Sequence, residues 1–120
     1  MERIFVDGSG FNGRTSSYCV FWEHGPVKEN HEIFTLQENR TNNEMEYAAV
    51  IVALESSSNN EIYTDSQLVV NQVAGKWKVK EAHLKPLCQR VQELLKEKDS
   101  TLHWIPREEN LAGKILERRK

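Results

Sequence analysis

The stretch T-N-N-E-M-E-Y-A-A-V-I-V-A-L, at residues 41–54, decides the fold. Thr41 and Glu44 have the spacing of a capping box, which marks the start of a helix. Apolar residues then follow at helical spacing from Met45 to Leu54, and they also fill most of the remaining circumference. A helix that is apolar nearly all round is buried between layers. The sequence therefore predicts that this helix lies inside the molecule, with other elements packed around it.

Three strands are predicted ahead of this helix. Residues 3–7 form a short apolar segment, and residues 17–23 are rich in the β-branched and aromatic side chains that are typical of strands. Gly25 and Pro26 indicate a turn, after which residues 31–36 form the third strand. The three segments lie close enough in sequence to form an antiparallel meander.

Strands and helices are predicted behind the central helix. The expected elements are a strand at 61–64, a helix at 66–74, an amphipathic helix at 84–95, a strand at 101–105 and a closing helix at 110–118. A meander followed by βαβ units indicates an α/β fold in which helices pack on a mixed sheet. No repeat or linker interrupts the pattern, so residues 1–120 are expected to form a single domain.

The composition limits the function. With 38% hydrophobic and 28% charged residues, the chain is typical of a soluble globular protein. Its 16 basic and 18 acidic residues leave a net charge of −2, so any binding of nucleic acid needs a local basic patch or bound cations. No apolar run approaches the ~20 residues of a membrane span. The first residues do not have the pattern of a signal peptide, and we expect a cytoplasmic protein that does not bind membranes.

The cysteine pattern agrees with that location. Cys19 and Cys88 are far apart and form no C-x-x-C pair, so a zinc-ribbon or thioredoxin-like site has no support. Free buried thiols in a reducing cytosol are the first interpretation. The spacing alone leaves a Cys19–Cys88 disulfide open.

Acidic residues are predicted at one edge of the sheet. Asp7 ends the first strand and Asp65 follows the fourth, and ligands of α/β sheets bind at the carboxyl ends of strands. Each aspartate is also typical of an ordinary turn or cap. Glu46 lies in the first turns of the buried helix, where an acid can also serve to complement the helix dipole. Glu44 already fills that role, which favours a separate function for Glu46.

The three carboxylates together predict a metal site. Carboxylates that converge repel one another unless a cation lies between them. Hard oxygen ligands favour Mg²⁺ or Mn²⁺ over zinc. Asp7, Glu46 and Asp65 are therefore the candidate ligands of a divalent cation.

Four motifs resemble those of one family. The sequences F-V-D-G-S-G at 5–10, T-N-N-E-M-E at 41–46, Y-T-D-S-Q at 63–67 and W-I-P-R-E-E-N at 104–110 look like the motifs of type 1 ribonuclease H. They cover nearly the whole chain, in the right order and at suitable spacing. The resemblance implies a ribonuclease H-like fold, with a five-stranded mixed sheet of order 3-2-1-4-5 that is flanked by helices. Only strand 2 is then antiparallel to the rest.

The resemblance also implies a reaction. The family cleaves the RNA strand of RNA/DNA hybrids by two-metal-ion hydrolysis, with Mg²⁺ or, in its place, Mn²⁺. By position, Asp7 would bridge two ions when substrate is bound, and Glu46 and Asp65 would hold the second. The hybrid is the implied partner, and nothing in the sequence indicates an obligatory protein partner.

Three polar residues resemble family positions that contact the backbone and minor groove of the hybrid: Asn12, Asn43 and Gln67. RNA is distinguished from DNA there by its 2′-hydroxyl groups. The alternative for Asn43 is a turn residue, and for Gln67 a solvated residue in the first turn of a helix. The loop after the first motif varies in length, which leaves the role of Asn12 open.

The family pattern breaks in the closing helix. The family has a fourth carboxylate in a pattern like N-x-x-A-D-x-L-A, whereas residues 110–117 are N-L-A-G-K-I-L-E. An ungapped match puts Lys114 at the position of the aspartate, and Leu116 on the leucine supports that register. A shift of one residue puts Gly113 there instead. Neither residue supplies a metal ligand.

Asn110 is the best substitute for the missing acid that the sequence offers. It lies one turn before Lys114, and Mg²⁺ accepts an amide oxygen as a ligand. A plain helix cap is the alternative. Three further acids lie nearby without matching the motif position: Glu108, Glu109 and Glu117.

The missing acid leaves two functions to compare. An active, metal-dependent endoribonuclease is the leading hypothesis. A domain of the same fold that binds hybrids with weak or no cleavage is the second, and Lys114 favours it. A related nuclease acting on DNA, such as a resolvase or integrase core, is disfavoured by the T-N-N-x-M-E and D-S-Q motifs.

A basic stretch follows the second predicted helix. Lys76, Lys78 and Lys80 surround Trp77, and alternating residues of an extended segment lie on one side. A solvated face is one interpretation. The other is a patch that grips a nucleic-acid backbone, like the basic protrusion of some family members.

Overall fold

The protein is described here by a computed structural model that covers residues 2–23 and 30–118. A five-stranded sheet lies at its centre, in the order β3-β2-β1-β4-β5. The strands are β1 (Glu2–Ser9), β2 (Ser16–Trp22), β3 (His31–Leu36), β4 (Asn60–Thr64) and β5 (Thr101–Trp104). Strand β2 pairs antiparallel with β1 and β3, whereas β4 pairs parallel with β1 and β5. The expected order and the antiparallel strand 2 are both confirmed.

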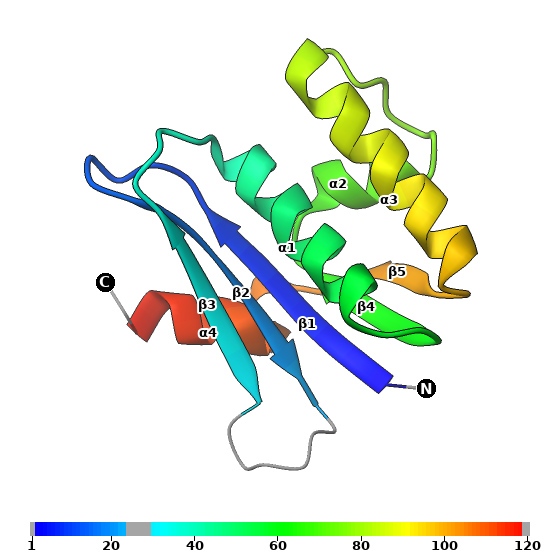
Figure 1. Ribbon diagram of the computed structural model, residues 1–120, viewed down its shortest axis with the longest axis horizontal. Helices are drawn as coiled ribbons and strands as arrows, with labels where there is room; N and C mark the ends of the chain where they lie inside the picture. The colour runs from blue at the N-terminus through cyan, green and yellow to red at the C-terminus, as the bar shows by residue number, and fades with distance from the viewer. Residues whose placement is uncertain (1, 24–29, 119–120) are drawn as a thin grey trace.

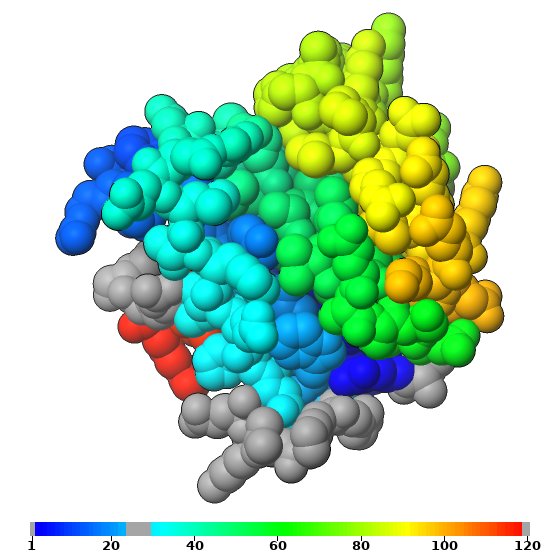
Figure 2. All heavy atoms as spheres, in the orientation of Figure 1, coloured from blue at the N-terminus to red at the C-terminus, as the bar shows by residue number. Residues whose placement is uncertain are grey.

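The helices are divided between the two faces of the sheet. Helices α1 (Asn42–Ser56), α2 (Gln67–Val73) and α3 (Lys85–Glu97) lie on one face, and α4 (Leu111–Arg118) lies on the other (Figure 1). Helix α1 packs against both the sheet and α3, so the expectation that it is buried between layers is confirmed. In the space-filling view, the first turn of α3 and the segment before it, in yellow-green, project at one edge of the molecule (Figure 2).

Alternation along β1 sends its side chains to the two cores. Ile4 and Val6 are buried on the α1 side, while Phe5 packs with Ala112 and Leu116 of α4. Successive side chains of a strand point to opposite faces, so the residue after Val6 belongs to the α4 side. This register places Asp7 beside α4 at the end of the strand.

The start of α1 is fixed by its caps. The Thr41 hydroxyl accepts from the Glu44 N–H at 3.1 Å, and the Glu44 carboxylate accepts from the Thr41 N–H at 3.0 Å, so the capping box is confirmed. Deeper in the helix, the buried Tyr47 hydroxyl donates to Gln72 of α2 at 2.7 Å. These bonds fix the first turns of α1, which carry Glu46, relative to the sheet and to α2.

The structure differs from the sequence predictions in a few details. The first strand runs on to Ser9, the last ends at Trp104, and two short 3₁₀ turns, η1 (Ala82–Leu84) and η2 (Arg107–Glu109), are new. The predicted turn at Gly25 and Pro26 lies outside the described residues.

The two cysteines are free and buried. Cys19 lies in the core on the α4 side and Cys88 in the core on the α1 side, so the sheet separates them. The expectation of free buried thiols is confirmed, and the Cys19–Cys88 disulfide that the spacing left open does not form. Among the described residues, no helix is long and apolar enough to cross a membrane.

Candidate active site

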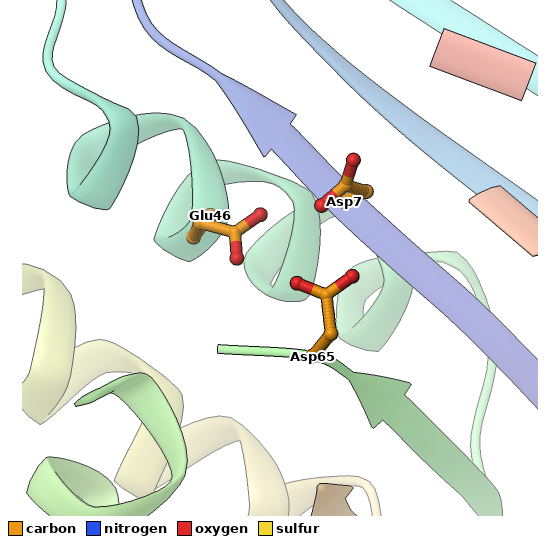
Figure 3. Close-up of side chains that lie close together, drawn as sticks. All are labelled: Asp7, Glu46 and Asp65. Atoms are coloured by element: carbon orange, nitrogen blue, oxygen red, sulfur yellow. The ribbon is translucent and has the colours of Figure 1, made fainter. Parts of the chain in front are cut away.

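Three carboxylates meet where β1 and β4 end. Asp7 is on β1, Asp65 directly follows β4, and Glu46 is in the first turns of α1 (Figure 3). Each offers an oxygen, and these oxygens all lie within 4.8 Å of one another. The parallel pairing of β1 and β4 explains the arrangement, because it brings the carboxyl ends of the two strands to one edge. The structure therefore brings together the three acids that the sequence singled out.

Close packing of α1 on the end of β1 positions Glu46. The Gly8 N–H donates to the Glu46 carboxylate. A Cβ on Gly8 would stand 2.6 Å from the carbonyl oxygen of Met45, which is backbone and has no room to move. Only glycine allows this approach. The glycine of the D-G motif thus holds the helix, and with it the Glu46 side chain, against the strand.

Asp65 is held by groups on both sides of it. The Trp104 indole N–H donates to the Asp65 carbonyl at 3.1 Å. The Asn110 amide donates to the Asp65 carboxylate at 3.0 Å and to the carbonyl of Val6 at 2.9 Å. Asn110 thereby ties the start of α4 to the ends of both central strands.

The three acids form a site of high negative charge density. Asp7 is only 3% exposed and Glu46 only 7%. Burial, followed by the nearby Asp65 carboxylate, raises the pKa of Asp7 to about 6. Burial also raises the pKa of Glu46 well above its usual value, and the charges of Asp7 and Asp65 add to this effect. Such a group of oxygens is suited to a divalent cation, which favours the charged form of all three.

A cleft of about 260 Å³ opens beside the acids. Besides the three carboxylates, it is lined by Asn43 from α1, Arg107 from η2 and Glu117 from α4. One Arg107 nitrogen, Nη1, lies 3.7 Å from Oδ2 of Asp65, and Nη2 donates to Oε1 of Glu117 at 2.8 Å. The positive charge of Arg107 lowers the pKa of Asp7, against the larger effect of burial.

The sequence did not single out Arg107 as a residue of the cleft, and it offered Glu117 only as a nearby acid that does not match the motif position. Arg107 stands within the quoted W-I-P-R-E-E-N motif, between the last strand and the cap of α4, and that position was the available signal. The signal for Glu117 was its place among the acids near the closing helix, although the ungapped match put Lys114 at the motif position.

Lys114 does not lie at the position that the ungapped match gave it. Gly113 faces the acids: a Cβ there would stand 3.3 Å from Oδ2 of Asp7 and 3.6 Å from Oδ2 of Asp65. Lys114 is turned about 100° further round the helix. It is exposed and lines a different groove, with Arg3 and Glu109. Lys114 therefore does not face the acids as the ungapped match implied, whereas Gly113, the residue given by the one-residue shift, does.

The rotation of α4 explains this correction. The side chains of Ala112 and Leu116 pack into the apolar cluster with Phe5 of β1. Their burial fixes which side of the helix meets the sheet, and Gly113 is the residue that this rotation points at Asp7. The charged Lys114 is left on the solvent side.

Asn110 acts as a helix cap in the structure. Its side chain is fully buried, and its oxygen accepts from the N–H groups of Ala112 and Gly113 at 3.1 and 3.4 Å. The amide nitrogen, not the oxygen, points at Asp65. This geometry favours the cap over a metal ligand.

The expected contacts with substrate lie in different places. Asn43 lines the cleft. Asn12 is exposed, and its side-chain oxygen accepts from the N–H groups of Arg14 and Thr15, both at 2.9 Å, so it also shapes its own loop. Gln67 is exposed at the start of α2 and does not line the cleft.

The basic stretch forms a second groove. Lys76, Lys78 and Lys80 line one groove of about 470 Å³ with Trp77, whose side chain is 47% exposed. The three lysines thus line a common groove, and the indole between them lines it as well. An exposed indole among cations offers both stacking and charge to a nucleic-acid strand.

Comparison with known proteins gives a consistent result. The family described as RNase H matches residues 1–113. The RNase H1 of the archaeon Halobacterium salinarum has a similar structure, with a TM-score of 0.81 and 27% identity over 96% of this chain and 92% of that one. LC11-RNase H1, solved in complex with an RNA/DNA hybrid, has a TM-score of 0.79 and 27% identity over 97% of this chain and 93% of that one.

A third solved structure has a similar fold. The N-terminal RNase H domain of a Mycobacterium tuberculosis protein has a TM-score of 0.77 at 24% identity. The alignment covers 98% of this chain and 94% of that one.

Proposed function

Because the chain belongs to the RNase H family, we propose that it is a metal-dependent endoribonuclease that hydrolyses the RNA strand of RNA/DNA hybrids. The observation that carries the proposal is the convergence of Asp7, Glu46 and Asp65 on one point, at the edge of the sheet where such folds bind ligands. The similar LC11-RNase H1 was solved with an RNA/DNA hybrid, which supports the substrate class.

The acids fit the metal ions that the family generally depends on. They offer only hard oxygen atoms, and the pKa values of Asp7 and Glu46 are raised first by burial and then by the neighbouring carboxylates, a repulsion that a cation relieves. We propose that Asp7, Glu46 and Asp65 would hold two ions when substrate is bound, with Mg²⁺ as the natural ion and Mn²⁺ as a substitute. When bound, two such ions activate water and stabilise the leaving oxygen of a phosphodiester.

The protein's own residues prepare the cleft for this reaction. The Gly8 N–H and the Asn110 amide orient Glu46 and Asp65, so that the carboxylates need little rearrangement before a cation binds. Arg107 supplies a fixed positive charge beside a cleft that must accept phosphate. Asn43 lines the same cleft and offers an amide to the 2′-hydroxyl or backbone of the RNA strand.

Contacts away from the cleft would hold the hybrid. Asn12 and Gln67 are exposed and available to the backbone of the substrate. The groove of Lys76, Trp77 and Lys78 would grip the hybrid through phosphate contacts, which a protein of net charge −2 cannot obtain from its overall field.

The basic groove has a direct test. Replacing Lys76, Lys78 and Lys80 by alanine should weaken binding of the hybrid and reduce the slope of log affinity against log salt by up to about three units. Titrations of fluorescent hybrid at several salt concentrations measure that slope. An unchanged slope would make the groove a solvated surface.

One observation favours a second candidate, a hybrid-binding domain that cleaves weakly or not at all. Gly113 faces Asp7 and Asp65, so α4 supplies no acid at the backbone position nearest to them. A poorly held ion would slow the activation of water. This candidate predicts tight binding of the hybrid without fragments.

A panel of labelled duplexes separates the two candidates. RNA/DNA hybrid, DNA duplex and RNA duplex are incubated with the protein in Mg²⁺, Mn²⁺ or chelator. We expect cleavage of the hybrid alone, and only with metal present. Binding of the hybrid without cleavage in either metal would favour the second candidate, and cleavage of the DNA duplex would contradict both.

A further inference from the structure

We propose that Glu117 takes the place of the missing fourth carboxylate and that Arg107 holds it at the edge of the cleft until a cation is bound. This inference rests on the proposed metal-dependent function and names a further residue of the same site. It concerns this chain in particular, because here the backbone position nearest Asp7 and Asp65 on α4 carries no side chain.

The first step is the space that Gly113 leaves. A side chain at this position would start 3.3 Å from the Asp7 carboxylate and 3.6 Å from that of Asp65. Because residue 113 is glycine, it directs no side chain at these two carboxylates. The cleft beside the two acids is the space that a longer side chain from the neighbouring turn can reach.

The second step is the position of Glu117. It follows Gly113 by four residues, and residues four apart lie on the same face of a helix. It lines the cleft together with the three acids. A glutamate has one methylene more than the aspartate of the family pattern, which lengthens its reach toward the adjacent turn.

The third step excludes the other acids and amides of this region. Glu108 and Glu109 line the groove that contains Lys114 and Arg3, away from the cleft. The Asn110 oxygen accepts from two backbone N–H groups at the start of α4. Among the candidates that the sequence offered, Glu117 alone lines the cleft.

The fourth step is the contact with Arg107. Its Nη2 and Nε donate to Oε1 of Glu117 at 2.8 and 3.1 Å, while its Nη1 lies 3.7 Å from Oδ2 of Asp65. One guanidinium group thus spans the gap between Glu117 and Asp65. The arginine offsets the repulsion that a fourth carboxylate would add to the metal-free site.

The Glu117 side chain is free to change partner. It is 54% exposed and lies near the end of α4. Rotation of this side chain toward a bound cation therefore displaces no core packing. Its present bonds to Arg107 lie at the surface, where ion pairs are weak. Once Glu117 turns to the cation, Arg107 becomes available to a substrate phosphate.

The test measures metal binding apart from catalysis. Mn²⁺ binding to the free protein is measured by calorimetry for wild type, Glu117→Gln and Glu109→Gln, and the Mg²⁺ dependence of hybrid cleavage is measured alongside. Glu117→Gln should weaken Mn²⁺ binding and raise the half-maximal Mg²⁺ concentration, each by about tenfold, as expected for loss of a group that supports the metal. Glu109→Gln makes the same change of charge on the other groove and should match wild type.

Repeating the Glu117→Gln change in an Arg107→Gln protein shows whether Glu117 supports the cation itself or only neutralises Arg107. In Arg107→Gln protein, the Glu117→Gln change should still weaken Mn²⁺ binding by about the same factor. Loss of the effect in that background would overturn the proposal. Equal Mn²⁺ affinities of wild type and Glu117→Gln would overturn it as well.

A rescue completes the experiment. Gly113→Asp, placed in the Glu117→Gln protein, restores an acid beside Asp7 and should recover Mn²⁺ affinity. If the wild type binds Mn²⁺ but leaves the hybrid intact, the proposed function fails, whereas the comparison of Mn²⁺ affinities still decides the role of Glu117. A wild type that binds no Mn²⁺ would overturn both.

Discussion

The two sides of the cleft are built in different ways. On one side, Asp7 and Glu46 are almost fully buried, and they stand on a central strand and on a helix that is packed between layers. On the other side, Arg107 and Glu117 are about half exposed, on a 3₁₀ turn and near the end of the last helix. Gly113 lies between them, with no side chain.

This difference separates a rigid half from an adjustable half. Burial and backbone hydrogen bonds fix the carboxylates of the first half, so a cation finds its ligands already in place. The second half is held by the ion pairs of Arg107 with Glu117 and Asp65, and the pair with the exposed Glu117 costs little to rearrange. With Glu117 in its proposed role, the chain would lack an acid at position 113 and keep a metal site, whereas a loss from the buried half has no neighbouring substitute.

The largest effect is expected from Asp65→Asn, which removes the charge of the third proposed metal ligand. Hydrolysis should fall by at least about a thousandfold, or about 4 kcal/mol of barrier. The fold should remain, because an asparagine oxygen can still accept from Asn110, and the metal-free protein should melt at a higher temperature because one repulsion is gone. Single-turnover cleavage and thermal unfolding in chelator measure both. Near-wild-type cleavage would remove Asp65 from the mechanism.

The next largest effect is expected from adding a methyl group to the glycine on one side of the cleft, Gly8, compared with adding one to Gly113 on the other. Gly8→Ala forces a Cβ into the backbone of α1 and should destabilise the protein by about 2–3 kcal/mol, while it displaces Glu46 and slows hydrolysis. Gly113→Ala meets only side-chain atoms and should change stability by less than about 1 kcal/mol. Denaturant unfolding compares the two. Equal losses would contradict the contrast between a rigid and an adjustable side.

The buried half should also make metal-free stability depend on pH. Folding raises the pKa of Asp7 to about 6, mainly through burial, above the ~4 of an unfolded aspartate. The folded state then binds more protons in this range, so the contribution of Asp7 to stability is complete below pH ~4 and is lost as the pH rises through about 6. Unfolding in chelator should show Asp7→Asn gaining stability relative to wild type between these values. Saturating Mg²⁺ should shrink that gain, and a difference independent of pH would contradict the assignment.

The smallest effect is expected from Lys114→Asp. Its side chain is exposed in a groove away from the acids, so the change in activity should stay within about twofold, as for a screened surface charge. The rate is measured against Mg²⁺ concentration beside wild type. A clear gain in activity at low Mg²⁺ would instead place residue 114 at the metal and restore the ungapped register.

The same contrast explains what the sequence could predict. The order of strands, the buried central helix and the convergence of Asp7, Glu46 and Asp65 followed from motifs placed on long or buried elements. In those elements, the hydrophobic pattern leaves a single way to orient the chain. The resemblance to type 1 ribonuclease H supplied the strand order, which composition and periodicity alone did not.

The fourth position could not be predicted in the same way. A one-residue shift on an eight-residue helix changes which side chain faces the sheet by about 100°. The choice was made by packing of Ala112 and Leu116 against Phe5, a contact between distant parts of the chain. The ion pair of Arg107 with Glu117 depends on the 3₁₀ turn η2, which has no strong sequence signal of its own.

The most direct test of the account is a single-turnover reaction on a hybrid whose RNA and DNA strands carry different end labels. With excess protein and Mg²⁺, we predict internal fragments of the RNA strand, an intact DNA strand, and no fragments when the metal is chelated. An RNA strand that stays intact in Mg²⁺ and in Mn²⁺, while the protein demonstrably binds the hybrid, would contradict the claim that this site is a metal-dependent ribonuclease.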